Sequence, residues 1–486
     1  MSIKAGVFLP FAREDVWSWF TMPGSTERLA PNSLPITHIL ADTNHATGSS
    51  VYSFPAGLKW ITRYELSSYQ RGRSFTETCV RGPFRPLTDW SHQHHFMDAK
   101  EFIAAASTED TTEDNSEKSS SDATSISLVD SSLPYSPDVD LKNPKGTILE
   151  NRFIAKLPER NLRAYFGYYH NQLLRDLCLA NDLGLLDSQR DKEAHPFTIA
   201  VTGTSSTIGQ PLIAQLQTLG FNVKLLPRKN GSRSKDPNAW DPKKPAANLL
   251  NDVDLLIHLA GESLQGRAND GHYQAIRDSR LGPTVELAKL VSASPRCKGM
   301  IMDSVDCGDE RLTSIFTEIE EAARAHCANF LPIRRAAVFS ARSGLLPLLR
   351  AVHKTGLGGK LGSLETQCSW ISIDDLTDIY ARAVHQLCQN GDSHIWPRYY
   401  TAVAPEKITT ATLMETLARR FNTRTIIPIP DFSPRLLLGE PGARLLIARD
   451  HALQAELPEG HRFRYPTIDA ALAHELMGEK PPILNL

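Results

Sequence analysis

Two glycines, Gly203 and Gly209, stand six residues apart in the run VTGTSSTIGQ (residues 201–210) and could help to hold a phosphate group. The residues before this run predict a strand, and those after it predict a helix. Gly203 allows a tight turn out of the strand, and Gly209 allows the helix to pack closely on the sheet. Because the first N–H groups of a helix and its dipole attract anions, the turn predicts a pyrophosphate site. Its residues would be Gly203, Ser206, Thr207, Ile208 and Gly209.

Ser206 occupies the middle position of this turn, where glycine usually lets the backbone approach the phosphates. Its side chain either narrows the site or offers a hydroxyl to a phosphate, and the sequence leaves both alternatives open. A turn with two glycines is a weak signal by itself. Its position between a predicted strand and a predicted helix strengthens it.

Arg228 lies nineteen residues after Gly209, at the end of the next predicted strand. An acidic residue at this place binds the ribose hydroxyl of NAD, whereas a basic residue suits the 2′-phosphate of NADP. Arg228 therefore favours NADP(H) over NAD(H) as the cofactor. The alternative is a solvated basic loop, which is the favoured interpretation for Arg233 and Lys235.

The elements around this turn alternate between strand and helix. Apolar runs predict strands at 197–203, 221–228, 253–261, 298–305 and 331–340, and helices at 209–219, 283–294 and 312–327. Strands covered on both faces are continuously apolar, as 253–261 is. Residues 197–400 therefore predict an α/β domain with a doubly wound parallel sheet of the Rossmann type. Residues 401–486 predict a small capping domain on the substrate side.

The first 185 residues have a different pattern. A short helix is predicted at 11–20, several alternating runs predict an antiparallel sheet, and Leu162–Asp182 predicts a long closing helix. Together these elements predict an α+β helix-grip domain in front of the Rossmann domain. Residues 107–140 hold ten serines, nine acids and one lysine, which predicts a disordered loop inside it.

The overall composition excludes several classes of protein. The net charge of −2 gives no case for a nucleic-acid or anionic-membrane partner, and no apolar run approaches the roughly 18 residues that span a bilayer. The seven cysteines include no C-x-x-C pair, which favours free thiols. We therefore expect a soluble cytoplasmic protein whose partner is a small molecule.

Five stretches carry a resemblance to a known family: HLAGESL (258–264), IRDSRLGPTVEL (276–287), VFSARSGLLPLLRAVHKTGLGGKLGS (338–363), SWISIDDL (369–376) and the terminal RLLLGE…FRYPTIDAAL. Residues 197–475 resemble the epimerase-like, SulA-like family of the extended short-chain dehydrogenase/reductase superfamily. The resemblance implies that Leu259, Ala260 and Gly261 lie under the nicotinamide-side ribose. It also implies that Arg277 and Arg280 point toward the cofactor or substrate; surface salt bridges are the alternative for each of them. The glycine-rich GLGGKLGS (356–363) would lie near the substrate and either hold a diphosphate or simply make tight turns.

A second resemblance covers the front of the chain. GTILENRFIAKLP (146–158) and YFGYYHNQLLRDL (165–177) are similar to START-like, polyketide-cyclase-like (SRPBCC) domains. This resemblance implies an apolar ligand in the N-terminal domain. Aromatic residues such as Trp17 and Tyr169 would line that pocket or simply fill the core.

The catalytic residues of the superfamily are a serine, a tyrosine and a lysine. Ser304 aligns with the serine and is the only candidate to polarise a carbonyl, but no Tyr-x-x-x-Lys pair follows it. Tyr273-x-x-x-Arg277 has the spacing in an earlier element, and Ser372 stands where the family commonly has histidine. Three acids, Asp306, Asp309 and Glu321, could carry a proton. The sequence thus leaves open an epimerase or oxidoreductase with an altered site and a catalytically inactive nucleotide- or apolar-ligand-binding protein.

His92 and His94 alternate on a predicted strand and would face the same way. This spacing is compatible with a metal ion, but no third ligand stands at a telling distance in the sequence. Polar histidines on a sheet face are more common, so we predict no metal.

Overall fold

The computed structural model describes residues 2–82, 90–102, 145–190, 197–229, 236–265, 269–306, 309–354, 367–389, 396–423 and 453–480. The serine-rich segment 107–140, Arg233, Lys235 and GLGGKLGS (356–363) lie outside these residues. The chain divides into two compact units: unit 1 holds residues 1–192 and 477–486, and unit 2 holds residues 193–476. No helix among the described residues is long and apolar enough to cross a membrane.

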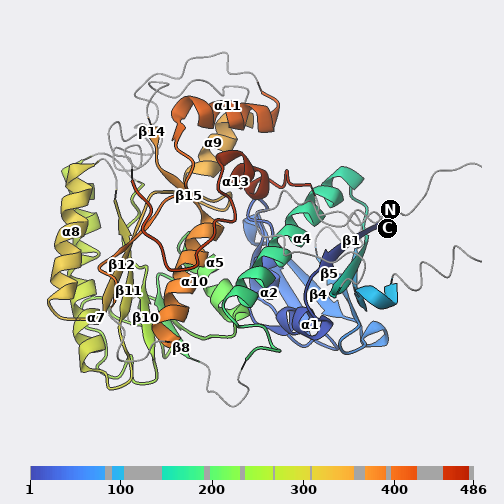
Figure 1. The fold of residues 1–486 in the computed structure, drawn as a ribbon, viewed down its shortest axis with the longest axis horizontal. Helices are drawn as coiled ribbons and strands as arrows, with labels where there is room; N and C mark the ends of the chain where they lie inside the picture. Colours follow the sequence, from blue (N-terminus) through green and yellow to red (C-terminus); the bar gives the residue numbers. More distant parts are fainter. Residues whose placement is uncertain are drawn as a thin grey trace, which may run out of the picture. The chain divides into compact units, whose positions relative to one another are not determined.

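Unit 1 contains a seven-stranded antiparallel sheet in the order β1-β7-β6-β5-β4-β3-β2. Its strands are β1 (Ser2–Leu9), β2 (Thr37–Leu40), β3 (Ser49–Ser53), β4 (Lys59–Tyr64), β5 (Ser74–Arg81), β6 (Ser91–Asp98) and β7 (Thr147–Ile154). The sheet is accompanied by α1 (Arg13–Thr21), α2 (Ser25–Leu29) and the long α4 (Glu159–Asp182). The predicted early helix, antiparallel sheet and long closing helix are all present (Figure 1).

The core of unit 1 is aromatic in one part and polar in another. Trp17 packs edge-on against Phe75 and Phe96, with ring centroids 5.8 and 5.2 Å apart. The last residues of unit 1 return to α4: the Arg175 guanidinium lies 2.9 Å from the Glu479 carboxylate, and the Asn171 amide donates to the Lys480 carbonyl at 3.0 Å. Unit 1 is therefore built from both ends of the chain.

Unit 2 contains the predicted parallel sheet, with strand order β16-β12-β11-β10-β8-β9. The strands are β8 (Thr198–Thr202), β9 (Asn222–Leu226), β10 (Leu255–His258), β11 (Met300–Val305), β12 (Phe330–Arg335) and β16 (Tyr400–Ala402). In Figure 1, α7 (Leu281–Ala293) and α8 (Glu310–Arg324) cover one face, and α5 (Gly209–Thr218) and α10 (Ile373–Gln389) the other. The doubly wound Rossmann prediction is confirmed.

The strand order reverses at β8, because β9 pairs with one edge of β8 and β10 with the other. In such sheets the crevice at the reversal, beyond the carboxyl ends of the strands, is where ligands bind. The turn that follows β8 opens at this point. The short helix α6 (Asp270–Asp278) follows β10 in the sequence.

One predicted strand, residues 331–340, is two strands in the structure. Residues 331–340 divide into β12 and β13 (Ala337–Phe339), and β13 pairs with β15 (Trp370–Ser372) instead of extending the main sheet. The change of direction falls at Ala336, whose N–H donates to the Ala402 carbonyl at 3.1 Å. The strand is divided because β12 pairs with β16 and β13 with β15. An apolar run in the sequence does not show which strands will be its neighbours.

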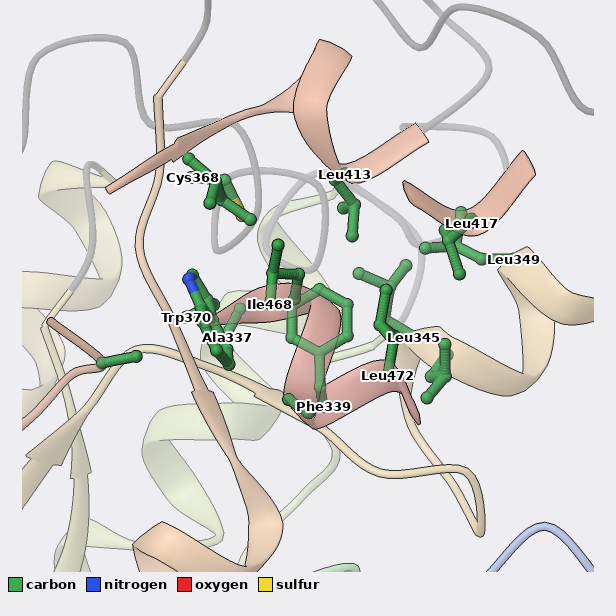
Figure 2. Close-up of a cluster of buried hydrophobic side chains, with 14 of the residues drawn as sticks. Ala337, Phe339, Leu345, Leu349, Cys368, Trp370, Leu413, Leu417, Ile468 and Leu472 are labelled. Atoms are coloured by element: carbon green, nitrogen blue, oxygen red, sulfur yellow. The ribbon is translucent and has the colours of Figure 1, made fainter. Parts of the chain in front are cut away.

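Unit 2 has a second hydrophobic core, which Figure 2 shows in close-up. It joins α9 (Leu345–Lys354), α11 (Thr410–Phe421) and α13 (Ile468–Glu475) to β13, β15, β14 (Gln367–Cys368) and β17 (Ile408–Thr409). Its residues include Ala337, Phe339, Leu345, Leu349, Cys368, Trp370, Leu413, Leu417, Ile468 and Leu472. This core draws on both 337–370 and 404–472, so it crosses the predicted boundary at residue 401.

Candidate functional site

Gly203 ends β8 in a conformation that needs glycine. Its φ is +68°, in the left-handed region. A Cβ at this position would lie 2.6 Å from the carbonyl carbon of Leu259 and 2.8 Å from the nitrogen of Ala260. The turn after β8 is therefore pressed against the backbone that follows β10, which brings three of the predicted site residues together.

Ser206 closes the turn onto α5. Its N–H donates to the Gly203 carbonyl at 2.9 Å, and its Oγ accepts from the Gly209 N–H at 3.0 Å. The hydroxyl thus satisfies the N–H of the first residue of α5 from within the turn, two residues before the N-cap position Ile208. No hydrogen bond within the described part of the chain uses the N–H of Thr207 or Ile208. These two donors lie at the positive end of α5, where an anion would bind.

Thr202 joins the carboxyl ends of β8 and β10. Its Oγ1 lies 2.7 Å from Nδ1 of His258 and accepts from the N–H groups of Leu259 and Ala260 at 3.2 and 3.3 Å. His258 is buried, and burial lowers its pKa to about 3, so the ring is neutral. Sequence reasoning missed both residues, although a threonine directly before the turn glycine is a visible signal.

Gly261 and Arg280 are in direct contact. A Cβ on Gly261 would lie 2.6 Å from Nε and 2.7 Å from Nη1 of Arg280, so glycine makes room for the guanidinium. Arg280 is 7% exposed, and burial lowers its pKa to about 10, which leaves it charged at neutral pH. The Asp303 carboxylate opposes that shift.

Arg277 points elsewhere. It forms a two-pronged ion pair with Glu318 of α8, at 2.7 and 2.5 Å, on the surface of unit 2. Arg277 therefore forms a surface salt bridge, the alternative to a position toward the cofactor or substrate. Although the residues are three apart, Arg277 lies inside α6 and Arg280 after it, at the start of α7.

Arg228 is exposed and lies two residues after β9. Leu226 at the end of β9 pairs in parallel with Thr202 at the end of β8. Arg228 and the turn at Gly203 therefore leave the sheet at the same edge. Arg228 also forms an isolated parallel bridge with Trp240, which fixes the backbone direction beyond the strand.

Ser304 is fully buried on β11, and its hydroxyl donates to the Glu320 carboxylate at 2.6 Å. Arg334 donates to the same carboxylate through two nitrogens, at 3.1 and 2.6 Å. This network fixes α8 to β11 and β12. The neighbouring Asp303 forms its own ion pair with Arg335 at 2.8 Å. The role of Ser304 in polarising a substrate stays a prediction.

The other candidates for proton transfer have structural partners or face solvent. The Tyr273 hydroxyl donates to Asp309 at 2.7 Å, and Asp309 accepts two N–H groups of α8 as its N-cap. Glu321 is exposed on α8. Ser372 donates to Asp375 at 2.7 Å and caps α10.

A segment from a distant part of the chain contacts the turn. Ser343 Oγ donates to Thr207 Oγ1 at 2.8 Å, and Arg342 Nη1 donates to the Gln210 side-chain oxygen at 3.0 Å. Both residues lie between β13 and α9. The sequence analysis did not single out either residue, since only the fold brings positions so far apart together.

The polar residues inside unit 1 are hydrogen-bonded to one another. His94 Nε2 lies 2.9 Å from the Tyr169 hydroxyl, and Asn151 bridges His92 and His170 at 3.1 and 2.8 Å. Burial lowers the pKa of His92 to about 3.

Among the described residues, the one group of three potential metal-ligating side chains whose ligand atoms lie within 4.8 Å of one another is Asp374, His474 and Glu475 in unit 2.

A cavity of about 210 Å³ lies in unit 2, between β14, residues 403–408 and residues 453–455. Its lining includes Cys368, Glu406 and Lys407. None of the lining residues belongs to the turn after β8.

Known proteins are similar to this chain over different lengths: one solved structure matches nearly the whole chain, and two other relatives match somewhat more than half of it. No family model matches the sequence. The solved structure of the nucleoside-diphosphate sugar epimerase from Corynebacterium glutamicum matches 98% of this chain and 91% of its own, at 31% identity and a TM-score of 0.72. An epimerase family protein of Mycobacterium tuberculosis is 27% identical over 298 residues, which cover 57% of this chain and 96% of the relative. The human epimerase family protein is 26% identical over 298 residues, covering 56% and 98%.

Proposed function

Since the chain belongs to the epimerase family, we propose that unit 2 binds NADP(H) at the turn after β8 and acts on a small-molecule substrate. The observation that carries the proposal is the geometry of this turn. Gly203 presses against the backbone after β10, and the N–H groups of Thr207 and Ile208 are left for a phosphate at the start of α5. The same crevice is the binding position in doubly wound sheets generally.

Each part of the cofactor has a proposed set of contacts. The pyrophosphate lies against Gly203, Ser206, Thr207, Ile208 and Gly209. The nicotinamide-side ribose lies over Leu259, Ala260 and Gly261, with Arg280 behind Gly261. Arg228 binds the 2′-phosphate from the neighbouring strand end, which favours NADPH over NADH. Ser206 donates its hydroxyl hydrogen to a phosphate, while its oxygen still accepts the hydrogen bond from the Gly209 N–H.

The cofactor would supply hydride transfer to or from a carbonyl carbon. The chain would supply placement of the nicotinamide through Gly261, and the positive charge of Arg280 at the end of β10. Ser304 is the proposed polariser of the substrate oxygen. In this role it would have to turn its hydroxyl away from Glu320, to which the hydrogen is donated in the structure.

A catalytically inactive binding protein is the second candidate. Two observations favour it: the Ser304 hydroxyl is buried and paired with Glu320, and the Tyr273 hydroxyl is paired with Asp309. Either arrangement removes a proton donor from the crevice. An inactive protein would still bind the dinucleotide, because the turn after β8 does not depend on these groups.

Two measurements test the proposal. Calorimetric titration with NADPH and then NADH, in buffer without phosphate, should show binding and a preference for NADPH. Absence of binding by either would contradict the cofactor site. A hydride-transfer assay with dicarbonyl and quinone substrates then separates the two candidates. Steady oxidation of NADPH that disappears in Ser304→Ala supports the enzyme, and no turnover with intact binding supports the inactive protein.

Unit 1 is proposed to be a START-like domain that holds a largely apolar ligand between the sheet and α4. The antiparallel sheet closed by one long helix supports this proposal. Glu77 and His94 are buried inside the unit, and His94 Nδ1 has no hydrogen-bond partner among the described residues. A ligand there would therefore need at least one polar group beside its apolar surface.

The division into 1–185, 197–400 and 401–486 stays a prediction, as does a cytoplasmic location. The six cysteines in the described residues are free, which supports a reducing compartment.

A further inference from the structure

The segment 340–344 places a guanidinium at the start of α5. Arg342 contacts Gln210, the second residue of that helix, at 3.0 Å, and Ser343 contacts Thr207 of the turn at 2.8 Å. Consecutive residues of the segment thus contact two residues that are one helical turn apart, Gln210 and Thr207. The segment therefore runs over the helix end where the N–H groups of Thr207 and Ile208 have no hydrogen-bond partner within the described residues.

The segment is anchored from behind. The Ala341 N–H donates to the Glu475 carboxylate at 2.5 Å, and Glu475 is 1% exposed within α13. The Arg342 N–H donates to Ser340 Oγ at 3.3 Å, and Gly344, with φ +86°, turns the chain into α9. Arg342 itself is half-buried. Its position is thus set by the fold before any ligand arrives, which lowers the cost of ordering it on binding.

One contact of Arg342 is with a neutral acceptor, the Gln210 amide oxygen. An ionised phosphate oxygen would form a stronger, charge-assisted bond with the guanidinium. A positive side chain beside the turn would add a second source of charge to the N–H groups at the start of α5.

We propose that Arg342 is a further cofactor-binding residue, which donates to the pyrophosphate from the side opposite the turn. This inference rests on the proposed dinucleotide site. It assigns the two arginines different parts of the cofactor: Arg342 the pyrophosphate, common to NADPH and NADH, and Arg228 the 2′-phosphate, present in NADPH only.

Calorimetric titration of the full chain with NADPH, NADH and adenosine 2′-monophosphate separates these roles. Arg342→Gln should weaken NADPH and NADH by the same factor, about tenfold to a hundredfold for one charge-assisted hydrogen bond. It should leave adenosine 2′-monophosphate unchanged, since that probe lacks the pyrophosphate. Arg228→Ala should instead weaken NADPH and adenosine 2′-monophosphate and spare NADH.

Two variants serve as controls. Arg342→Lys keeps the charge and should retain most of the affinity at low salt. Arg296→Gln makes the same change of charge at the opposite edge of the sheet, where Arg296 pairs with Asp254 just before β10, and should bind like the unaltered chain. Thermal unfolding of each variant checks that the fold is retained.

The outcomes distinguish the two proposals. If the unaltered chain binds neither dinucleotide, the proposed function fails and this inference with it. If the unaltered chain binds and Arg342→Gln binds both dinucleotides equally well, only the role of Arg342 is overturned. A change in the NADPH-to-NADH ratio in Arg342→Gln would also overturn it, because it would place Arg342 at the 2′-phosphate.

Discussion

The Thr202 hydroxyl lies 2.7 Å from Nδ1 of His258 and links the ends of β8 and β10. The Thr202 oxygen already accepts from the N–H groups of Leu259 and Ala260, so its hydrogen goes to Nδ1. We therefore assign the proton of the neutral His258 ring to Nε2. One side chain thus satisfies two backbone donors and one ring nitrogen at the point where the crevice opens.

Replacing Thr202 with valine should destabilise unit 2. The change keeps the shape but leaves the buried His258 Nδ1 and two N–H groups without their partner, which costs about 1–3 kcal/mol. Urea unfolding measures this loss, and Thr202→Ser, which keeps the hydroxyl, should recover most of it. Equal stability of the valine variant and the unaltered chain would show that water replaces the hydroxyl at no cost.

Gly203→Ala should abolish binding of the dinucleotide. A Cβ there meets the backbone of Leu259 and Ala260, and the positive φ adds about 1–3 kcal/mol of strain. Calorimetry with NADPH measures the loss. Gly282→Ala is the matched control, since Gly282 lies in α7 with nothing within 4 Å of its would-be Cβ. That control should bind normally and be slightly more stable.

Arg228→Ala should remove most of the preference for NADPH over NADH. The guanidinium is exposed at the strand end beside the turn, so its loss affects the 2′-phosphate and leaves the fold intact. The ratio of the two dissociation constants is the measurement. If the unaltered chain binds both cofactors equally, the argument from Arg228 is wrong whatever the variant does.

The stability of unit 2 should fall as the pH drops below 6.5. Burial lowers the pKa of His258 from 6.5 to about 3 in the folded state. Between these values the unfolded chain takes up a proton that the folded chain does not, so acid favours unfolding, by roughly 1.4 kcal/mol per pH unit. Above pH 6.5 the contribution of this group is fully present.

The pH dependence is best measured as a difference between two chains. His258→Gln should lose this slope between about pH 6 and pH 3, while other histidines of unit 2 whose pKa is lowered by burial, such as His461, contribute equally to both chains. Urea unfolding at a series of pH values gives the two curves. Parallel curves would mean that His258 is reached by water or by a proton in the folded protein.

Local patterns predicted the scaffold of the site but only part of its contacts. The apolar run before Gly203 and the glycine spacing predicted β8, its turn and α5, because each signal lies within a few residues. The bond between the Ser206 hydroxyl and the Gly209 N–H was also within reach, since the residues are three apart and serine side chains often bond nearby backbone groups.

The remaining contacts depend on which strands become neighbours. Arg342 reaches Gln210 across 132 positions of sequence, and Ser304 finds Glu320 only because α8 packs on β11. Neither pairing leaves a periodic trace. The difference between Arg277 and Arg280 depends on where α6 ends and α7 begins, a boundary that sequence patterns locate poorly.

The ion pair between Arg175 and Glu479 has a consequence for dissecting the protein. Since residues 477–480 complete the packing around α4, unit 2 is topologically an insertion within unit 1. A gene fragment that stops at residue 192 would encode unit 1 without its closing strap. An expression plasmid for unit 1 alone should instead join residue 192 to residue 477 through a short linker, which deletes unit 2 and keeps both segments of unit 1. In chain order, unit 1 is therefore the discontinuous unit, and unit 2, with its parallel sheet, is the continuous one.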